Sequence, residues 1–214
     1  MTGTSRMTAA SGSSVTPGSS VWKRSKWLSP LGAAALITLF ALAGWQLGQG
    51  LYIKAKAQLA QVLLETAWQE SLQTGTPHKA WAWADTWPVA RLTVPRLGIS
   101  EIVLSNASGE ALAFGPGQLS TTKLGNGGLS AVAGHRDTHF AFLKELRPGD
   151  RIELTTMDGE AMAYSVIGTE IVDSATTKLN PATGNGLVLV TCYPFDAVAH
   201  GPLRYLVFAK LVIL

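Results

Sequence analysis

At 214 residues with a hydrophobic fraction of 47%, this chain is long enough for one ordinary domain with appendages and apolar enough for a packed core. Only 14% of the residues are charged, which suggests that part of the apolar content lies in a membrane. The net charge of +3 comes from the N-terminal tail, because residues 31–214 carry 13 basic and 14 acidic residues, and this balance argues against a nucleic-acid-binding surface.

Residues 1–30 form the basic tail, with four Lys or Arg residues and no acidic residue. They are rich in Ser, Thr and Gly and show no apolar periodicity, which predicts a disordered segment. Met7 is an alternative start to Met1.

Residues 31–53 contain no charge, and a helix of this length is roughly 34 Å long, enough to cross a bilayer. A cleavable signal peptide is the alternative, because Ala41-Leu42-Ala43 has the small-x-small form of a cleavage site. The apolar residues continue past that site to Tyr52, which favours a retained transmembrane helix. The basic residues before the helix place the N-terminus inside and the rest of the chain outside.

Residues 54–73 carry apolar side chains at helical spacing, which predicts a short stalk helix that ends at Gly75-Thr76-Pro77. A tryptophan-rich linker follows, up to residue 86. Its alternate tryptophans are more often packed against a domain than used to bind a cofactor.

The globular body begins at residue 87, and short apolar runs bounded by turn residues predict its strands. These runs are 89–94, 99–104, 129–133, 151–156, 161–172, 187–190 and 205–214, with a short helix over 139–146. Many strands and little helix predict a mainly β domain, either an antiparallel barrel or a sandwich.

The lone cysteine, Cys192, follows the buried run 187–190, and Arg204 opens the next strand. The two strands therefore bring a thiol and a guanidinium to one rim, where an arginine can stabilise a thiolate or an oxyanion. His135 follows the run 129–133 and is the predicted base. An isolated cysteine in an apolar strand is more often inert and buried, but these two neighbours favour a reactive thiol.

The sequence contains three histidines besides His135. His78 lies in the linker and is set aside. His139 is four residues from His135, a spacing that suits a metal on a helix, but no further ligand motif lies nearby and we do not expect a metal site. His200 lies in the loop between Cys192 and Arg204 and is the main rival of His135 as the base.

Three stretches together resemble the sortases, cysteine transpeptidases that attach surface proteins to cell envelopes: Gly-His-Arg-Asp-Thr-His-Phe at 134–140, Leu-Val-Thr-Cys at 189–192, and Arg204. Val188 stands where the family pattern has threonine, a change that a buried strand position tolerates. Residues 81–92 and the apolar segment before them are similar to the Gram-negative branch of the family.

The resemblance implies an eight-stranded β-barrel over residues 87–214, held at the periplasmic face of the inner membrane by a single-pass anchor. It implies cleavage of a Leu-Pro-x-Thr-Gly-like sorting motif between Thr and Gly, with Cys192 as nucleophile, His135 as acid and base, and Arg204 on the oxyanion. Thr191 would line the substrate groove. The implied partners are an exported protein with a C-terminal sorting signal and an envelope amine, and no cofactor is needed.

Two alternatives use other chemistry. A cysteine peptidase would employ the same site with water as the acceptor, which a comparison of amine incorporation with hydrolysis would detect. A membrane-anchored β-barrel that only binds would need no reactive thiol, so slow alkylation of Cys192 would favour it.

Overall fold

The computed structural model describes residues 30–119, 124–125, 128–179, 186–197, 199 and 201–212. The predicted disordered tail and His200 therefore lie outside the described residues. The chain divides into two units, residues 1–49 and residues 50–214.

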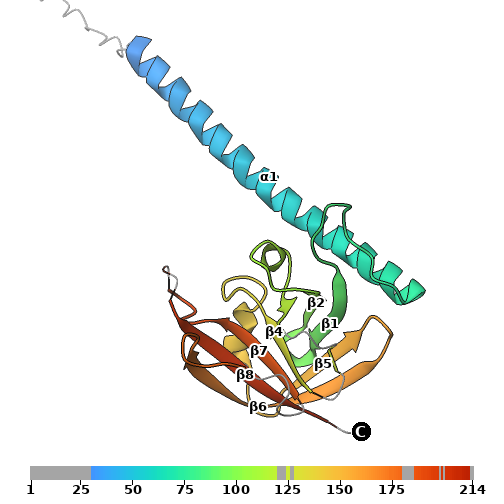
Figure 1. Cartoon of the computed structure of the whole chain (residues 1–214). Coiled ribbons are helices and arrows are strands. Elements are labelled where there is room, and N and C mark those ends of the chain that lie inside the picture. The colour runs from blue at the N-terminus through green and yellow to red at the C-terminus, as the bar shows by residue number, and fades with distance from the viewer. Residues whose placement is uncertain are drawn as a thin grey trace, which may run out of the picture. The chain divides into compact units, whose positions relative to one another are not determined.

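The first element, α1 (Pro30–Thr74), is one continuous helix of 45 residues (Figure 1). It joins the predicted transmembrane and stalk helices, because no proline interrupts the chain between them and interior glycines weaken a helix without ending it. The helix ends at Gly75, whose φ of 67° is the left-handed conformation that glycine adopts readily and whose N–H donates to Ser71 O at 2.9 Å.

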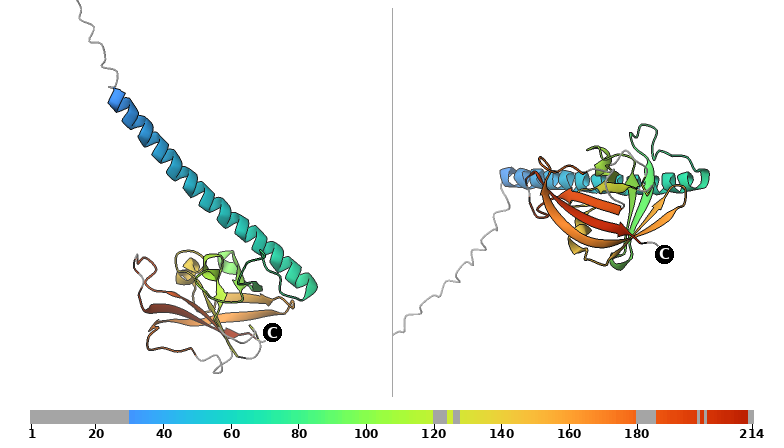
Figure 2. Two further views of the ribbon diagram at one scale, coloured as in Figure 1. Left: turned by 45° about the horizontal axis from the view of Figure 1, so that its top comes forward. Right: turned by 60° about the horizontal axis from the view of Figure 1, so that its bottom comes forward.

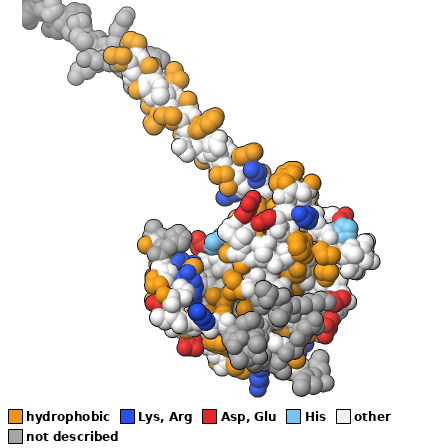
Figure 3. Space-filling view, in the orientation of Figure 1, with side chains coloured by type: hydrophobic (Ala, Val, Ile, Leu, Met, Phe, Trp, Pro, Cys, Tyr) orange, Lys and Arg blue, Asp and Glu red, His pale blue; other side chains and the backbone are white. Residues whose placement is uncertain are grey.

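The N-terminal part of α1 exposes large apolar side chains along its length (Figure 3). Seven of them before residue 50 are more than half exposed: Leu31, Ile37, Leu39, Phe40, Leu42, Trp45 and Leu47. Within the described part of the chain, α1 is the one helix long and apolar enough to cross a membrane. Because such side chains are unfavourable in water, this segment is a candidate membrane anchor.

The second unit contains a closed barrel with the strand order β1-β2-β3-β4-β7-β8-β6-β5 (Figures 1 and 2). The strands are β1 (Pro88–Val94), β2 (Ile99–Leu104), β3 (Gly117–Gln118), β4 (Leu129–Ala133), β5 (Arg151–Thr156), β6 (Ala161–Asp173), β7 (Gly186–Cys192) and β8 (Leu203–Leu211). Most pairs are antiparallel, whereas β2 pairs with β3 and β4 with β7 in parallel. The eight-stranded barrel is confirmed and the sandwich is excluded.

The short helical segments differ from the prediction. The expected helix over 139–146 is a 3-10 helix, η3 (Ala141–Glu145), whose turns are closed by bonds between residues three apart, such as Leu143 N–H to Phe140 O. Two further 3-10 turns, η1 (Pro95–Leu97) and η2 (Ala111–Ala113), lie in the connections around β2. The strand β3 was not predicted, because two residues are too few to show a period.

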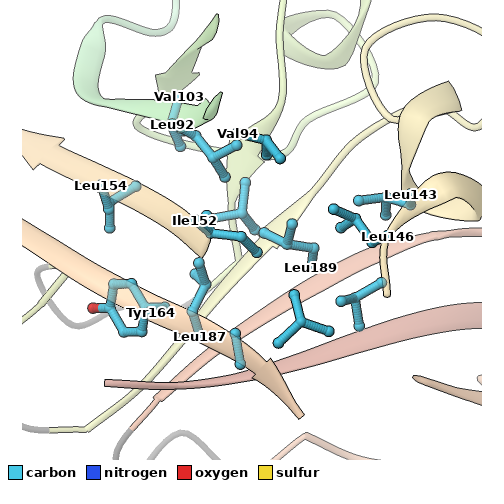
Figure 4. Close-up of a cluster of buried hydrophobic side chains, with 14 of the residues drawn as sticks. Leu92, Val94, Val103, Leu143, Leu146, Ile152, Leu154, Tyr164, Leu187 and Leu189 are labelled. Atoms are coloured by element: carbon cyan, nitrogen blue, oxygen red, sulfur yellow. The ribbon is translucent and has the colours of Figure 1, made fainter. Parts of the chain in front are cut away.

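The barrel interior is filled by apolar side chains from β1, β2, β4, β5, β6, β7 and β8, with Leu143 and Leu146 from the η3 region; Figure 4 shows part of this core. Along β7 the side chains alternate between two apolar clusters: Leu187 and Leu189 belong to the interior core, and Val188 and Val190 to a second cluster with Leu206 of β8. Both faces of β7 are therefore covered, which explains its continuous apolar run.

The C-terminal part of α1 packs on the barrel within the second unit. Leu64 is 1% exposed and lies in a cluster with Leu104 of β2 and Ala111 of η2. Glu65 accepts two hydrogen bonds of 2.7 Å from Arg91 Nη2 on β1. Partial burial of Glu65 opposes its ionisation, but hydrogen bonds from Gln69 and Arg91 outweigh this and lower its pKa. The predicted stalk is thus part of the folded unit.

Candidate active site

Three strand ends meet at one rim of the barrel. The strand β7 is paired with β4 on one side and with β8 on the other. Because β4 and β7 run in parallel, both reach this rim at their C-terminal ends, and the antiparallel β8 starts there. Cys192 ends β7, so the thiol lies between the segment that follows β4 and the beginning of β8.

Cys192 and Arg204 are direct partners in the β7–β8 ladder. Directly opposite residues of an antiparallel pair have Cα atoms about 4.5–5.5 Å apart. The thiol is free and partly exposed. Side chains alternate along a strand, so Cys192 shares the face of Val188 and Val190 and points away from the interior core.

The segment that carries His135 is brought to the end of β7 by the parallel pairing of β4 with β7. Ala133 pairs with Val190, and Gly134 N–H continues the ladder by donating to Val190 O at 3.1 Å. His135 directly follows Gly134, so its segment leaves the barrel next to the end of β7 that carries Cys192. The His135 side chain is exposed.

The turn after β4 is fixed by Phe140, which is completely buried in the interior core. Phe140 N–H donates to His135 O at 2.9 Å, and this bond closes the turn. Gly134 lies directly over the ring, since a Cβ at this position would come within 2.7 Å of Phe140 Cγ. Glycine is therefore required at 134 for close packing, and its small size sets where His135 leaves the barrel.

Thr191 takes a different position from the one expected for a groove residue. It is 2% exposed, and its hydroxyl donates to Gly134 O at 2.7 Å. The alternation along β7 directs it to the opposite face from Cys192. Thr191 thus joins the strand that carries the cysteine to the segment that carries the histidine, and a contact with substrate stays a prediction.

The Arg204 guanidinium is held by its own loop. Its Nη1 donates to Gly201 O at 2.7 Å and to Leu203 O at 2.9 Å, and the side chain is partly buried. Both of these hydrogen bonds come from the same nitrogen, Nη1. Nε and Nη2 carry three further N–H donors, which have no hydrogen-bond partner among the described residues.

The other described histidines are engaged elsewhere. His78 Nε2 lies 2.9 Å from Thr74 Oγ1, and its Nδ1 lies 3.4 Å from Glu70 at the end of α1. His139 Nδ1 lies 2.9 Å from Glu101 Oε2 on β2. Across the described residues, no cluster of three or more His, Cys, Asp or Glu side chains has the proximity to hold a metal.

Two features of the rim were not predicted from the sequence. Arg136, next to His135, donates to the carbonyl oxygens of Ala197 and Ala199. Beyond Cys192, Tyr193 stacks on Tyr205 with ring centroids 6.2 Å apart, and Phe195 meets the Tyr205 ring at 5.2 Å. The sequence shows the aromatic residues but not their contacts, and nothing in it indicates the carbonyl partners of Arg136.

The fold and the rim together define a β-barrel protein that presents a free cysteine between a histidine and an arginine. Residues 92–212, more than half of the chain, match the family described as Sortase domain. The chain therefore belongs to the sortase family, as the resemblance of its motifs predicted.

Individual relatives agree with this assignment. Over 124 residues the chain is 31% identical to Sortase D of Bacillus subtilis (strain 168), a match that covers 56% of this chain and 62% of that protein. The chain thus spans somewhat less than two thirds of the length of this curated relative.

Solved structures share the barrel. Sortase A from Corynebacterium diphtheriae superposes with a TM-score of 0.54 at 23% identity, over 72% of this chain and 85% of that one. The Sortase D5 transpeptidase of Clostridium perfringens gives a TM-score of 0.52 at 22% identity, over 67% and 88% of the respective chains. At these identities the two likenesses support the fold.

Proposed function

We propose that this protein is a membrane-anchored cysteine transpeptidase that cleaves a Leu-Pro-x-Thr-Gly-like sorting motif between Thr and Gly and transfers the protein to an amine. The observation that carries the proposal is the position of Cys192, paired with Arg204 on β8 and flanked by the His135 segment after β4. A nucleophile, a proton carrier and an oxyanion donor thus meet at one rim.

In the first step, the Cys192 thiolate attacks the threonine carbonyl carbon and a C–S bond forms. The carbonyl oxygen becomes an oxyanion, which Arg204 stabilises with N–H donors. As the C–N bond to glycine breaks, protonated His135 gives a proton to the leaving nitrogen. The product is a thioester between the Cys192 sulfur and the shortened protein.

In the second step, an acceptor amine attacks the thioester carbonyl. Neutral His135 takes the proton of the incoming amine, so the histidine returns to its starting state. The C–S bond breaks, the thiolate of Cys192 is released, and a new amide joins the protein to the acceptor. Water in place of the amine gives hydrolysis, so the same site supports a peptidase reaction.

The face of β7 that carries Cys192 is apolar behind the thiol. Val188, Val190 and Leu206 lie on this face but are at most 9% exposed, so they support the cysteine from below and are not available to a peptide.

The test is a covalent intermediate. Incubation of the full chain with an acetylated Leu-Pro-x-Thr-Gly peptide should add the mass of the acyl fragment that ends at threonine to Cys192. Cys192→Ala should lose both adduct and turnover, while its thermal unfolding should match the wild type because a partly exposed side chain leaves little cavity. Turnover by the alanine variant would contradict the mechanism.

The same incubation separates the two reactions. Added amine should appear in the product of a transpeptidase, whereas a peptidase would release only the free acid. A thiol that neither forms an adduct nor reacts with iodoacetamide in the folded protein would instead support a barrel that only binds.

We further propose that the barrel faces the periplasm of a Gram-negative cell on a retained anchor. The support is the exposed apolar part of α1 with basic residues before it, and the similarity of residues 81–92 to the Gram-negative branch. Protease added to spheroplasts should digest the barrel and leave a membrane-bound N-terminal fragment. A mature protein that begins at Gly44 would contradict the anchor.

A further inference from the structure

Arg136 connects two segments of the rim that are far apart in the sequence. It directly follows His135, and its Nη2 donates to Ala197 O at 2.5 Å and to Ala199 O at 3.2 Å. Its Nη1 is buried, and among the described residues this nitrogen has no hydrogen-bond partner. The guanidinium thus lies against the connection between β7 and β8 instead of projecting into water.

The same connection holds Arg204. Gly201 O and Leu203 O both accept from Arg204 Nη1, and Leu203 O also accepts from Tyr193 N–H at 3.0 Å. Backbone carbonyls from the loop and from the first residue of β8 therefore bind two arginines: Ala197 and Ala199 bind Arg136, and Gly201 and Leu203 bind Arg204.

We propose that Arg136 is a positioning residue that sets the guanidinium of Arg204 relative to His135, acting through the backbone of the β7–β8 connection. This inference rests on the proposed transpeptidase function. Arg136 itself touches no reacting atom. It holds the loop next to Arg204 against the segment that carries His135, so that Arg204 and His135 act on the same scissile peptide bond.

The rate of the reaction depends strongly on the position of Arg204, because this residue is the proposed donor to the oxyanion. A hydrogen bond to an oxyanion needs its donor within a narrow range of distance, and a displacement of about 1 Å can cost about 10²-fold in rate. The carbonyls of Ala197 and Ala199 lie outside the strand ladders, and the side chain of Arg136 supplies the donors that bind them. Arg136 holds both carbonyls through the two N–H bonds of a single nitrogen, Nη2.

Hydrogen exchange tests the positioning without any turnover. Arg136→Ala should accelerate exchange at the amides of Tyr193 and Ala197 by about 10-fold or more, because both are bonded within the connection that Arg136 holds. Amides within β5 and β6 should exchange as in the wild type. The matched control is Arg151→Ala, which removes an arginine that is 49% exposed and bound to Glu153 on β5.

Steady-state kinetics test whether Arg136 affects the reaction rate by positioning Arg204. Arg136→Ala should lower kcat by about 10- to 100-fold with KM changed less than about threefold, and Arg136→Lys should recover part of the loss because an ammonium can still bind a carbonyl. In the Arg204→Ala background, Arg136→Ala should cost less than about threefold more, since the residue that it positions is already gone. Arg151→Ala should leave both constants unchanged.

Several results would overturn the inference: unchanged exchange at Tyr193 and Ala197, a rise in KM with kcat intact, or a full additional loss in the Arg204→Ala background. If Arg136→Ala does not fold, the same measurements on Arg136→Lys decide, with smaller expected changes. A wild-type chain that forms no peptide adduct would refute the transpeptidase proposal instead, and the exchange experiment would still test the positioning by Arg136.

Discussion

Cys192 and Arg204 occupy directly opposed positions of the antiparallel β7–β8 ladder. Their separation is therefore set by backbone hydrogen bonds of two regular strands and not by a flexible loop. A strand pair holds side chains more accurately than loops do, which suits the roles of nucleophile and oxyanion donor that we propose for Cys192 and Arg204. The segment that carries His135 reaches the same rim through a second strand pair, β4 with β7.

Arg204→Lys should lower kcat/KM by about 10- to 100-fold. The lysine ammonium keeps the charge but replaces the guanidinium fork with one nitrogen, which cannot bind Gly201 O and Leu203 O and also reach the oxyanion. Steady-state kinetics with a sorting-motif peptide measures the change. Near wild-type activity of the lysine variant would mean that Arg204 acts through its charge on the thiolate.

His135→Ala should lower kcat by about 10²- to 10⁴-fold and change the pH profile, because the leaving nitrogen loses its proton donor. His200→Ala should lose much less, since we expect His200 to affect mainly substrate binding or loop shape. The two variants should be compared at several pH values with the same peptide. A larger loss in His200→Ala would show that the base has been assigned to the wrong histidine.

The strands of the barrel were predicted closely because their apolar runs are bounded by turn residues. The segments 99–104, 129–133 and 151–156 coincide with β2, β4 and β5. The strand β3 escaped prediction because its two residues, Gly117 and Gln118, are defined by backbone pairing with β2 and β4 alone. The packing of residues 54–73 onto the barrel was missed because an amphipathic helix does not reveal its partner.

The site was predicted in part. Cys192, His135 and Arg204 all follow or open apolar runs, and their motifs resemble one family, so the sequence indicates that they meet. The structure brings their strand ends together at one rim. The alternation of side chains along a strand also predicts that Thr191 and Cys192 point to opposite faces of β7, which argues against placing both in one substrate groove. The contacts of Arg136 could not be predicted from the sequence. Its partners are backbone carbonyls 61 and 63 residues away, and any residue type has such a carbonyl.

The ion pair between Arg96 and Asp150 should make stability depend on pH. Arg96 Nε and Nη2 donate to the Asp150 carboxylate, which is 8% exposed, and these bonds, with Arg147 N–H, lower the pKa of Asp150 below its ordinary value of 3.8. A lowered folded-state pKa contributes stability above the unfolded pKa, and this contribution is lost as the pH falls through the folded value.

Asp150→Asn should therefore lower Tm at pH 7 by about 2–6 °C, and the difference from wild type should shrink below about pH 4. Thermal unfolding followed by circular dichroism at several pH values measures this. The control is Glu153→Gln, which removes a carboxylate that is 41% exposed and bound to Arg151. A difference for Asp150→Asn that persists undiminished at pH 2 would show that the carboxylate charge is not the cause.

Gly134→Ala should damage both stability and catalysis. The new Cβ would lie 2.7, 2.8 and 3.0 Å from Cγ, Cδ2 and Cδ1 of Phe140, a ring that is completely buried and has no room to retreat. Overpacking of this kind costs about 1–3 kcal/mol. Because Phe140 N–H closes the turn at His135 O, relief of the clash would shift His135, and we expect kcat to fall by about 10-fold or more.

The matched control is Gly168→Ala in β6, where an added Cβ meets no atom within 4 Å. This variant should unfold at or slightly above the wild-type temperature, because alanine restricts the unfolded chain more than glycine does. Its turnover should be unchanged. If Gly134→Ala keeps wild-type kcat while losing stability, the turn absorbs the clash without moving His135, and the tight packing of Gly134 on Phe140 serves the core alone.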